Sequence, residues 1–341
     1  MEGTVTIQEQ RETWLKERRS GIGGSDAAAI LGVSPWRTAL DVYSDKRGIS
    51  PLNTEPTSPM WWGTAMEDLI AKRYCEMTGF TICEDKPGIY RHGTHKELLG
   101  TPDRLVTVSG NVRGLEIKTS SQYLAQEWGN PGTDDVPTYY AAQCAHYMAV
   151  CDVDSWDLAV LIGGNDLRIF TLYRDLELEK SMIKTLTSWW KAHVLAGIPP
   201  EPSDPADESR YLKNLFPRNV GERKEADEEI QEVASKLEKA LEYMTVAEER
   251  VEMCRNALKK YIGDADGVDG DGWKATWKLT SETSATNWAR VAEYAMEAIS
   301  REGLWGKIGK DPNAIISKFT ELRPGHRRFT FTNGRRNGSG K

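Results

Sequence analysis

Residues 101–118 read Thr-Pro-Asp-Arg-Leu-Val-Thr-Val-Ser-Gly-Asn-Val-Arg-Gly-Leu-Glu-Ile-Lys. Two segments of strand-forming residues flank the turn residues Ser109, Gly110 and Asn111, which predicts a β-hairpin. If the hairpin is symmetric about Ser109 and Gly110, Asp103 lies opposite Glu116. The fold is therefore expected to be organised around this strand pair.

The second strand of the hairpin separates an apolar face from a charged one. Side chains alternate along a strand, so Leu115 and Ile117 point to one side and Glu116 and Lys118 to the other. Across the hairpin, Asp103 and Glu116 approach to roughly 5 Å, where like charges repel. A cation is therefore expected between them, and Mg²⁺ or Mn²⁺ fits because these ions prefer carboxylate and water oxygens.

Lys118 adds a third charged group to this face. Beside a metal ion, its ammonium could orient or deprotonate a water molecule, or stabilise charge on a phosphate. The alternative is a surface hairpin with a Glu116–Lys118 ion pair, because short motifs of this kind often occur by chance.

Length and composition bound the class of protein. The chain has 341 residues, of which 39% are hydrophobic and 28% charged, as in ordinary soluble proteins. One large domain with an appendage is predicted. No apolar run approaches the roughly 18 residues that span a bilayer, and no signal peptide is evident, so we expect a cytoplasmic protein without membrane contact. A formal charge of −7 argues against indiscriminate coating of DNA, but not against a basic DNA channel.

The cysteines are an odd number without a Cys-x-x-Cys pair. Their scatter predicts reduced, mostly buried thiols and neither a zinc site nor a disulfide framework. The five are Cys75, Cys83, Cys144, Cys151 and Cys254.

The order of several motifs resembles that of a known family. Thr101-Pro-Asp103 and Leu115-Glu-Ile-Lys118 have the spacing of the PD-(D/E)XK nucleases. The flanking motifs follow one another as in the YqaJ-like viral recombinases, the group that includes lambda exonuclease; they are Arg18-Arg-Ser-Gly-Ile-Gly-Gly-Ser-Asp26, Trp62-Gly-Thr-Ala-Met-Glu67 and Tyr140-Ala-Ala-Gln143. This resemblance covers about residues 10–200. It implies an α/β fold with a restriction-endonuclease-like core, in which helices flank a mixed sheet.

The resemblance also implies roles for the charged residues. Asp103, Glu116 and the backbone carbonyl of Ile117 would hold a first Mg²⁺ or Mn²⁺ ion. Glu67, with Asp103, would help to hold a second ion, and Lys118 would position the attacking water.

Glu67 has a second interpretation. Thr64-Ala-Met-Glu67 has the form of a capping box that opens a helix to Thr78, ended by Gly79. Glu67 is then the capping glutamate. Both roles are compatible with a helix whose buried stripe runs through Met66, Ile70, Tyr74 and Met77.

Arg18, Ser25 and Thr101 are the candidate DNA ligands. In the family, the residues that match Arg18 and Ser25 hold the 5′-phosphate of DNA, and Thr101 precedes the catalytic aspartate. Ser25 has the alternative role of N-cap for a short helix over residues 27–31, stopped by Gly32.

Gln143 and Tyr147 are expected to project together from a helix over residues 137–150, because they are four residues apart. Gln-x-x-x-Tyr matches the helix motif of RecB-type nucleases, which implies a site role for Gln143 with Tyr147 in support. Lambda-like members carry a second glutamine two residues after the first. This chain has Ala145 there, so the second glutamine's role is lost or met elsewhere.

The chain is predicted to have four segments. Residues 1–200 form the nuclease domain, with further strands at 156–162 and 167–173 and a closing helix at 176–196. Residues 201–221, rich in proline, read as a linker. Residues 222–262 form one long helix, and residues 263–341 form a small C-terminal region that ends in a basic, glycine-rich tail.

The long helix has apolar residues at alternating steps of three and four, the mark of a coiled-coil seam. The seam runs through Ile230, Val233, Leu237, Ala240, Met244, Ala247, Val251, Cys254, Leu258 and Tyr261. Two interpretations are open. The helix packs on another part of the same chain, or it contacts an oligomer or a partner.

The function implied by the resemblance is a Mg²⁺-dependent exonuclease acting on double-stranded DNA from the 5′ end. It would leave 3′ single strands for a phage-type annealing protein, as a homo-oligomer that is trimeric in some family members. One alternative is an endonuclease or junction-resolving enzyme of the same fold. The other is a non-catalytic DNA-binding or scaffolding protein.

Overall fold

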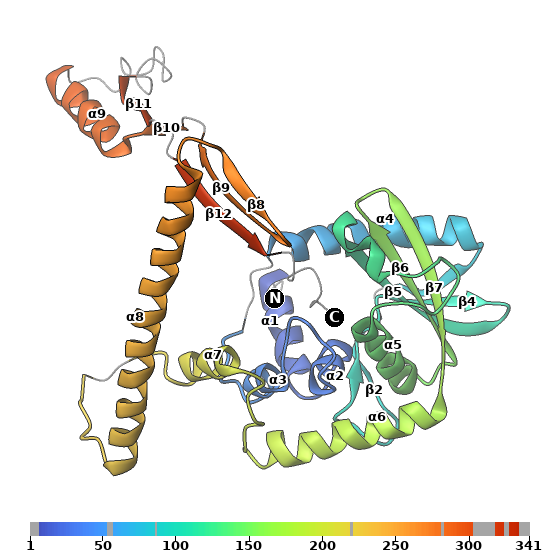
Figure 1. Cartoon of the computed structure of the whole chain (residues 1–341). Helices are drawn as coiled ribbons and strands as arrows, with labels where there is room; N and C mark the ends of the chain where they lie inside the picture. Colours follow the sequence, from blue (N-terminus) through green and yellow to red (C-terminus); the bar gives the residue numbers. More distant parts are fainter. Residues whose placement is uncertain are drawn as a thin grey trace. The chain divides into compact units, whose positions relative to one another are not determined.

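The computed structural model describes residues 7–52, 57–85, 87–218, 221–280, 283–302, 318–323 and 327–333. The chain divides into two compact units, Met1–Glu222 and Arg223–Lys341, each described by itself below (Figure 1). No helix in the described ranges is long and apolar enough to cross a membrane.

A five-stranded mixed sheet forms the centre of the first unit. Strands β5 and β6 are parallel, and the other neighbours are antiparallel. In spatial order the strands are β1 (Thr81–Asp85), β4 (Arg104–Val108), β5 (Asn111–Ser120), β6 (Ser155–Ile162) and β7 (Asp166–Tyr173). This is the mixed sheet expected from the sequence.

The β4–β5 hairpin has the predicted register. Val108 pairs with Asn111 and Arg104 with Leu115, so that Asp103, one step before β4, faces Glu116. Ser109 and Gly110 both have positive φ, 50° and 85°. Positive φ at both central residues is typical of a type I′ turn, whose twist matches that of the strands.

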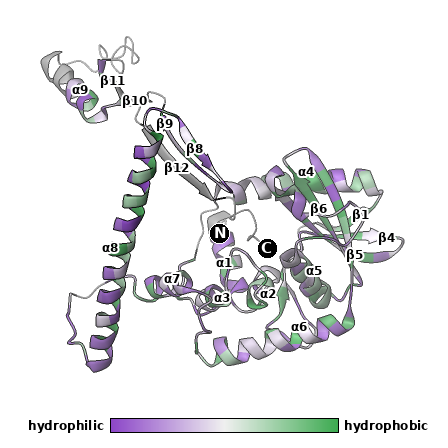
Figure 2. Ribbon diagram, in the orientation of Figure 1, coloured by the Kyte–Doolittle hydropathy of each residue, from purple (hydrophilic) through white to green (hydrophobic). Residues whose placement is uncertain are grey.

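Helices cover both faces of this sheet. On one face, Leu115 and Ile117 pack with Ile70 and Tyr74 of α4 (Ser58–Thr78). On the other face, buried residues of β6 pack against α5 (Thr138–Cys151). The charged face of β5 is therefore covered by α5, and Figure 2 shows hydrophobic residues along the central strands.

The remaining elements of the first unit surround this core. The helices are α1 (Ile7–Arg18), α2 (Gly24–Ile30), α3 (Ala39–Lys46), a 3₁₀ helix (Gln122–Glu127), α6 (Leu176–Trp189), a π-helical segment (Trp190–Leu195) and α7 (Pro205–Leu215). Strands β2 (Tyr90–Arg91) and β3 (Leu99–Gly100) form a small separate pair.

Three predicted boundaries in this unit are wrong. Helix α4 begins at Ser58, so Thr64 lies inside it and donates a hydrogen bond to the carbonyl of Met60 rather than opening a capping box. The N-cap of α2 is Gly23, not Ser25, because Asp26 accepts a hydrogen bond from the Gly23 N–H. The expected linker, residues 201–221, contains α7, which packs on α3.

A buried ion network joins α1, α2 and α3. Asp26 is 1% exposed and binds Lys46 and Arg37, each at 2.7 Å. Lys46 also donates to the Arg18 carbonyl at the end of α1. Burial alone raises the pKa of Asp26, but the charges of Lys46 and Arg37 outweigh it and hold this pKa below its ordinary value.

The second unit contains the predicted long helix, α8 (Glu228–Ile262), which begins after its N-cap Asp227. A three-stranded sheet of β12 (Arg327–Asn333), β9 (Trp273–Leu279) and β8 (Gly267–Gly270) follows it. The unit also holds α9 (Trp288–Glu302) and the pair β10 (Thr283–Thr286) and β11 (Thr320–Arg323).

The basic tail differs from the prediction in part. Arg327 and Arg328 belong to β12, which pairs antiparallel with β9, so this segment is a strand of the sheet and not part of an irregular tail. Arg335, Arg336 and Lys341 lie outside the described residues.

Candidate active site

Glu116 and Lys118 occupy the strand face beneath α5. The Lys118 Nζ lies 2.5 Å from Glu116 Oε1, and the same oxygen accepts a hydrogen bond from Gln143 Nε2 at 2.6 Å. Glu116 is 2% exposed, whereas the Lys118 side chain is 23% exposed. Glu116 Oε2 is buried and has no hydrogen-bond partner among the described residues. A buried carboxylate oxygen in this condition needs a ligand, because an unsatisfied charged group is costly.

Asp103 approaches the same face from the start of β4. Its Oδ2 accepts a hydrogen bond from the backbone N–H of Ile117 at 2.8 Å, which fixes the carboxylate. Burial and the negative charge of Glu116 raise the pKa of Asp103 well above its ordinary value, against the opposing effect of Lys118. Burial lowers the pKa of Lys118, but the charges of Glu116 and Asp103 outweigh it and raise this pKa.

Gln143 and Tyr147 project together from α5, as predicted. Gln143 is 8% exposed, and its amide lies 3.3 Å from the Tyr147 hydroxyl. Burial and the charge of Glu116 raise the pKa of Tyr147. A β-carbon on Gly24 of α2 would come within 2.8 Å of both side chains. Gly24 thus lets α2 pack directly against the residues that orient Glu116.

Glu67 is held by Arg104, a residue that the sequence analysis missed. Arg104 is 1% exposed and donates to Glu67 Oε1 at 2.6 Å, to Asp68 Oδ1 at 2.5 Å and to the Asp103 carbonyl at 2.6 Å. The available signal was an arginine at the start of a mostly apolar strand, because a buried guanidinium requires carboxylate partners.

The residues fit one metal ion better than two. Asp103, Glu116 and the Ile117 carbonyl offer hard oxygen ligands, and the unsatisfied Glu116 Oε2 and the raised pKa of Asp103 both favour a cation there. Within the described ranges, no group of three or more His, Cys, Asp or Glu side chains is placed to hold one ion. Glu67 is bound to Arg104 and does not join the other two carboxylates in this structure.

Two candidate phosphate ligands, Arg18 and Ser25, lie at the start of α2, and the third, Thr101, directly follows β3. The Arg18 guanidinium is next to Gly23 and 4.7 Å above the centre of the Trp14 ring. Ser25 is exposed in the first turn of α2, and Thr101 is half-buried. Of the three, Arg18 lines a cavity of about 680 Å³, whose walls combine basic, aromatic and acidic side chains: Arg11, Trp14, Trp36, Arg37, Asp26, Asp41 and Asp45.

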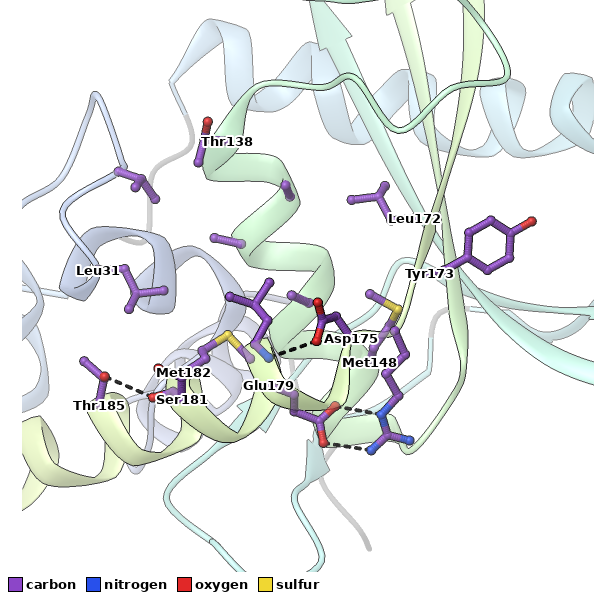
Figure 3. Close-up of a pocket in the computed structure, with 16 residues that line it drawn as sticks. Leu31, Thr138, Met148, Leu172, Tyr173, Asp175, Glu179, Ser181, Met182 and Thr185 are labelled. Carbon is purple, nitrogen blue, oxygen red and sulfur yellow. Dashed lines mark hydrogen bonds and ion pairs between the residues drawn. The ribbon is translucent and has the colours of Figure 1, made fainter.

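A second pocket, about 320 Å³ in volume, lies between α5 and α6 (Figure 3). Its walls are mostly apolar and include Leu31, Met148 and Met182. Ala145 lines this pocket and not the site at Glu116, because residues two apart on a helix point in nearly opposite directions. A glutamine at this position would therefore extend into the pocket and away from Gln143.

A mixed sheet between two helices, with Asp103 facing Glu116 and with Lys118 two residues after Glu116 on the same face, is the core of the PD-(D/E)XK nuclease fold. Within that class, the chain belongs to the YqaJ family. Residues 13–154 match the YqaJ-like viral recombinase domain. Over 276 residues the chain is 30% identical to the protein YqaJ of Bacillus subtilis strain 168, covering 79% of this chain and 83% of that relative. The family expected from the order of the motifs is thus confirmed.

Solved structures with similar folds are more distant. The alkaline exonuclease LHK-Exo from Laribacter hongkongensis is 18% identical, with a TM-score of 0.44 over 60% of this chain and 99% of that one. A phage-related exonuclease from Haemophilus somnus 129PT is 15% identical, with a TM-score of 0.37 over 50% of this chain and 92% of that one.

Proposed function

We propose that this protein is a metal-dependent deoxyribonuclease that degrades duplex DNA from the 5′ end and leaves a 3′ single strand. The observation that carries the proposal is the buried Glu116 carboxylate, with one oxygen bound by Lys118 and Gln143 and the other without a partner among the described residues. Membership of a viral recombinase family supports DNA as the substrate.

Each residue of the site has a separate task in this proposal. Asp103 and Glu116, with the Ile117 carbonyl, would hold Mg²⁺ or Mn²⁺, and such an ion would supply Lewis-acid activation of the phosphate and of water. Gln143 and the Ile117 N–H fix the orientation of the two carboxylates. Lys118, held protonated by its carboxylate neighbours, positions the attacking water and stabilises negative charge on the phosphate.

A second ion requires a change at Glu67. In the family resemblance Glu67 helps to bind that ion, but its carboxylate is bound to Arg104 here. We therefore infer that Glu67 would have to leave Arg104 before it could hold a second ion. The first ion needs no such rearrangement.

Recognition of the DNA end is assigned to Arg18, Ser25 and Thr101. Arg18 supplies positive charge, and the exposed Ser25 and the half-buried Thr101 supply hydroxyl groups for a 5′-phosphate. An annealing protein that receives the 3′ strand, and a ring-shaped trimer, are further proposals that rest on the family alone.

The direct test uses linear duplex DNA with a 5′-phosphate on one strand and a distinct label at each end, beside a closed circular duplex. With Mg²⁺, loss of the phosphorylated strand from its 5′ end and an intact circle are expected. EDTA should stop the reaction. Cutting of the circle would indicate the endonuclease alternative, and binding without cutting in Mg²⁺ or Mn²⁺ would indicate the non-catalytic one.

A further inference from the structure

Helix α8 carries an uncovered apolar seam. All residues from 228 to 257 are exposed, and large seam side chains remain about half exposed, as in Ile230 (53%), Leu237 (58%) and Met244 (52%). Of the seam, only the end near Leu258 is partly covered, where α8 meets β9. The helix of 35 residues is roughly 50 Å long at about 1.5 Å per residue.

A seam of this kind requires a partner. The apolar positions repeat every 3.5 residues over five heptads, which is the pattern of a coiled coil and not of a lone surface helix. Helices gain most of their stability from packing of the apolar face, and large exposed apolar surfaces mark interaction sites. None of the described residues of the second unit covers this seam along residues 228–257.

The sizes of the seam residues select the direction of pairing. The five first-position (a) residues are all large: Ile230, Leu237, Met244, Val251 and Leu258. Three of the five fourth-position (d) residues are small: Ala240, Ala247 and Cys254. A parallel pair stacks each residue on its own copy, so two of its layers would hold only alanines. Such layers leave voids that cost on the order of 1 kcal/mol each.

An antiparallel pair removes these voids, because it sets each a residue against a d residue. With all five heptads overlapping, Leu237 meets Cys254 of the second copy, Met244 meets Ala247, and Val251 meets Ala240. Each small residue then faces a large one, which is the alternation that close packing requires.

The charges beside the seam select the same direction. In a parallel pair, Arg250 would lie against Arg255 of the second copy, twice by symmetry, and like charges at these flanking positions repel. In the antiparallel pair, Arg250 lies instead beside Tyr243 of the second copy, whose ring attracts a guanidinium. The sizes of the seam residues and the charges beside the seam are independent features of the sequence, and both favour the antiparallel pair.

We propose that α8 is a dimerisation helix, whose seam pairs in antiparallel orientation with α8 of a second copy of this chain. The first test is the mass of the full chain, measured by sedimentation equilibrium at micromolar concentration. Met244→Glu places a charge at the centre of the seam and should halve the mass of the wild-type assembly. Val246→Glu places the same charge two residues further along, on the side of the helix away from the seam, and should leave the mass unchanged.

Two results would overturn the proposal. One is a wild-type chain that sediments as a monomer. The other is a Met244→Glu variant whose mass equals that of the wild type, because another surface would then hold the assembly together.

Disulfide formation tests the orientation. In the full-length Leu237→Cys variant, mild oxidation should join two chains through Cys254, and the added change Cys254→Ala should abolish this link. Wild-type chains should not crosslink through Cys254, which faces Leu237 in the antiparallel pair. A disulfide-linked dimer of wild-type chains that disappears in the Cys254→Ala variant would demonstrate parallel pairing and refute antiparallel pairing.

Discussion

Arg104 donates a hydrogen bond to Glu67 at 2.6 Å from a position that is 1% exposed. The same guanidinium holds Asp68 and the carbonyl of Asp103. It therefore connects α4 to Asp103, the residue directly before β4. One buried cation thus binds two neighbouring carboxylates of α4 and the backbone next to β4.

Arg104→Gln should lower the free energy of unfolding by about 3 kcal/mol, because it leaves carboxylates beside a buried site without their cation. Thermal and urea unfolding of the metal-free protein measure this loss. Arg73→Gln is the matched control on α4. Arg73 binds Glu76 at the surface, with its side chain 61% exposed, and its removal should change stability by no more than about 0.5 kcal/mol. Equal effects of the two changes would contradict the role of Arg104.

Asp103→Asn should stabilise the metal-free protein at pH 7. The raised pKa means that the folded state holds this proton more tightly than the unfolded chain. The Asp103 contribution to stability therefore falls as pH rises from the ordinary value of 3.8 through the folded pKa. The asparagine variant lacks this loss, so its melting temperature should be higher by about 2–4 °C.

Mg²⁺ should make the wild type more stable than the Asp103→Asn variant. Added metal stabilises a protein that binds it, so the wild type should gain stability and the Asp103→Asn variant should gain less. Melting curves with and without Mg²⁺ over pH 4–8 make both comparisons. A variant that is less stable than the wild type at pH 7 without metal would oppose this reading of the pKa.

Gly24→Ala should destabilise the first unit by about 1–3 kcal/mol, because the new methyl group would overlap Gln143 and Tyr147. Nuclease activity should fall as Gln143 moves from Glu116. Gly63→Ala is the matched substitution inside α4, where a β-carbon meets nothing within 4 Å. It should stabilise by about 0.5–1 kcal/mol, since alanine favours a helix interior. The two changes are thus expected to have opposite signs in thermal unfolding.

Lys118→Ala should reduce cleavage at least about 100-fold, because a charge that stabilises the reacting phosphate is removed. DNA binding should persist, and a filter-binding or gel-shift assay measures it beside single-turnover cleavage. Lys72→Ala, at an exposed position of α4, is the control and should leave both unchanged. Turnover retained in the Lys118 variant would remove this residue from the proposed mechanism.

Local signals predicted the centre of the fold well. The Ser109-Gly110 turn and the alternation in β5 were sufficient for the hairpin and for the placement of Asp103 opposite Glu116. Period-four spacing was sufficient to bring Gln143 and Tyr147 together. These features depend on residues near one another in sequence or on a register that one turn determines.

Proline accounts for two of the errors. Ser58-Pro59 and Asp204-Pro205 begin helices α4 and α7, although the first helix was expected to begin at Thr64 and the second segment was expected to be a linker. Proline fits the first turn of a helix, where its missing N–H is not needed. In α7, Asp204 accepts hydrogen bonds from two backbone N–H groups. A polar residue directly before proline was the signal for a helix start.

The partners of Arg104 could not be predicted in the same way. Asp68 and Glu67 lie 36 and 37 residues before Arg104 in sequence, and only the packing of α4 on the sheet brings them together. A charged residue in a strand indicates that a partner exists, but not which one. The buried pair of Asp26 and Lys46 has the same origin, since it depends on how α2 and α3 pack.

The contact of Gly24 with Gln143 and Tyr147 also has an evolutionary consequence. Gln143 and Tyr147 fill the space that a side chain at position 24 would need, so a larger residue there is tolerated only when one of the other two shrinks. Among relatives of this chain, the residues at these three positions should therefore change together. A lineage that gains a side chain at position 24 should carry a smaller residue than tyrosine at position 147, or have lost glutamine at position 143.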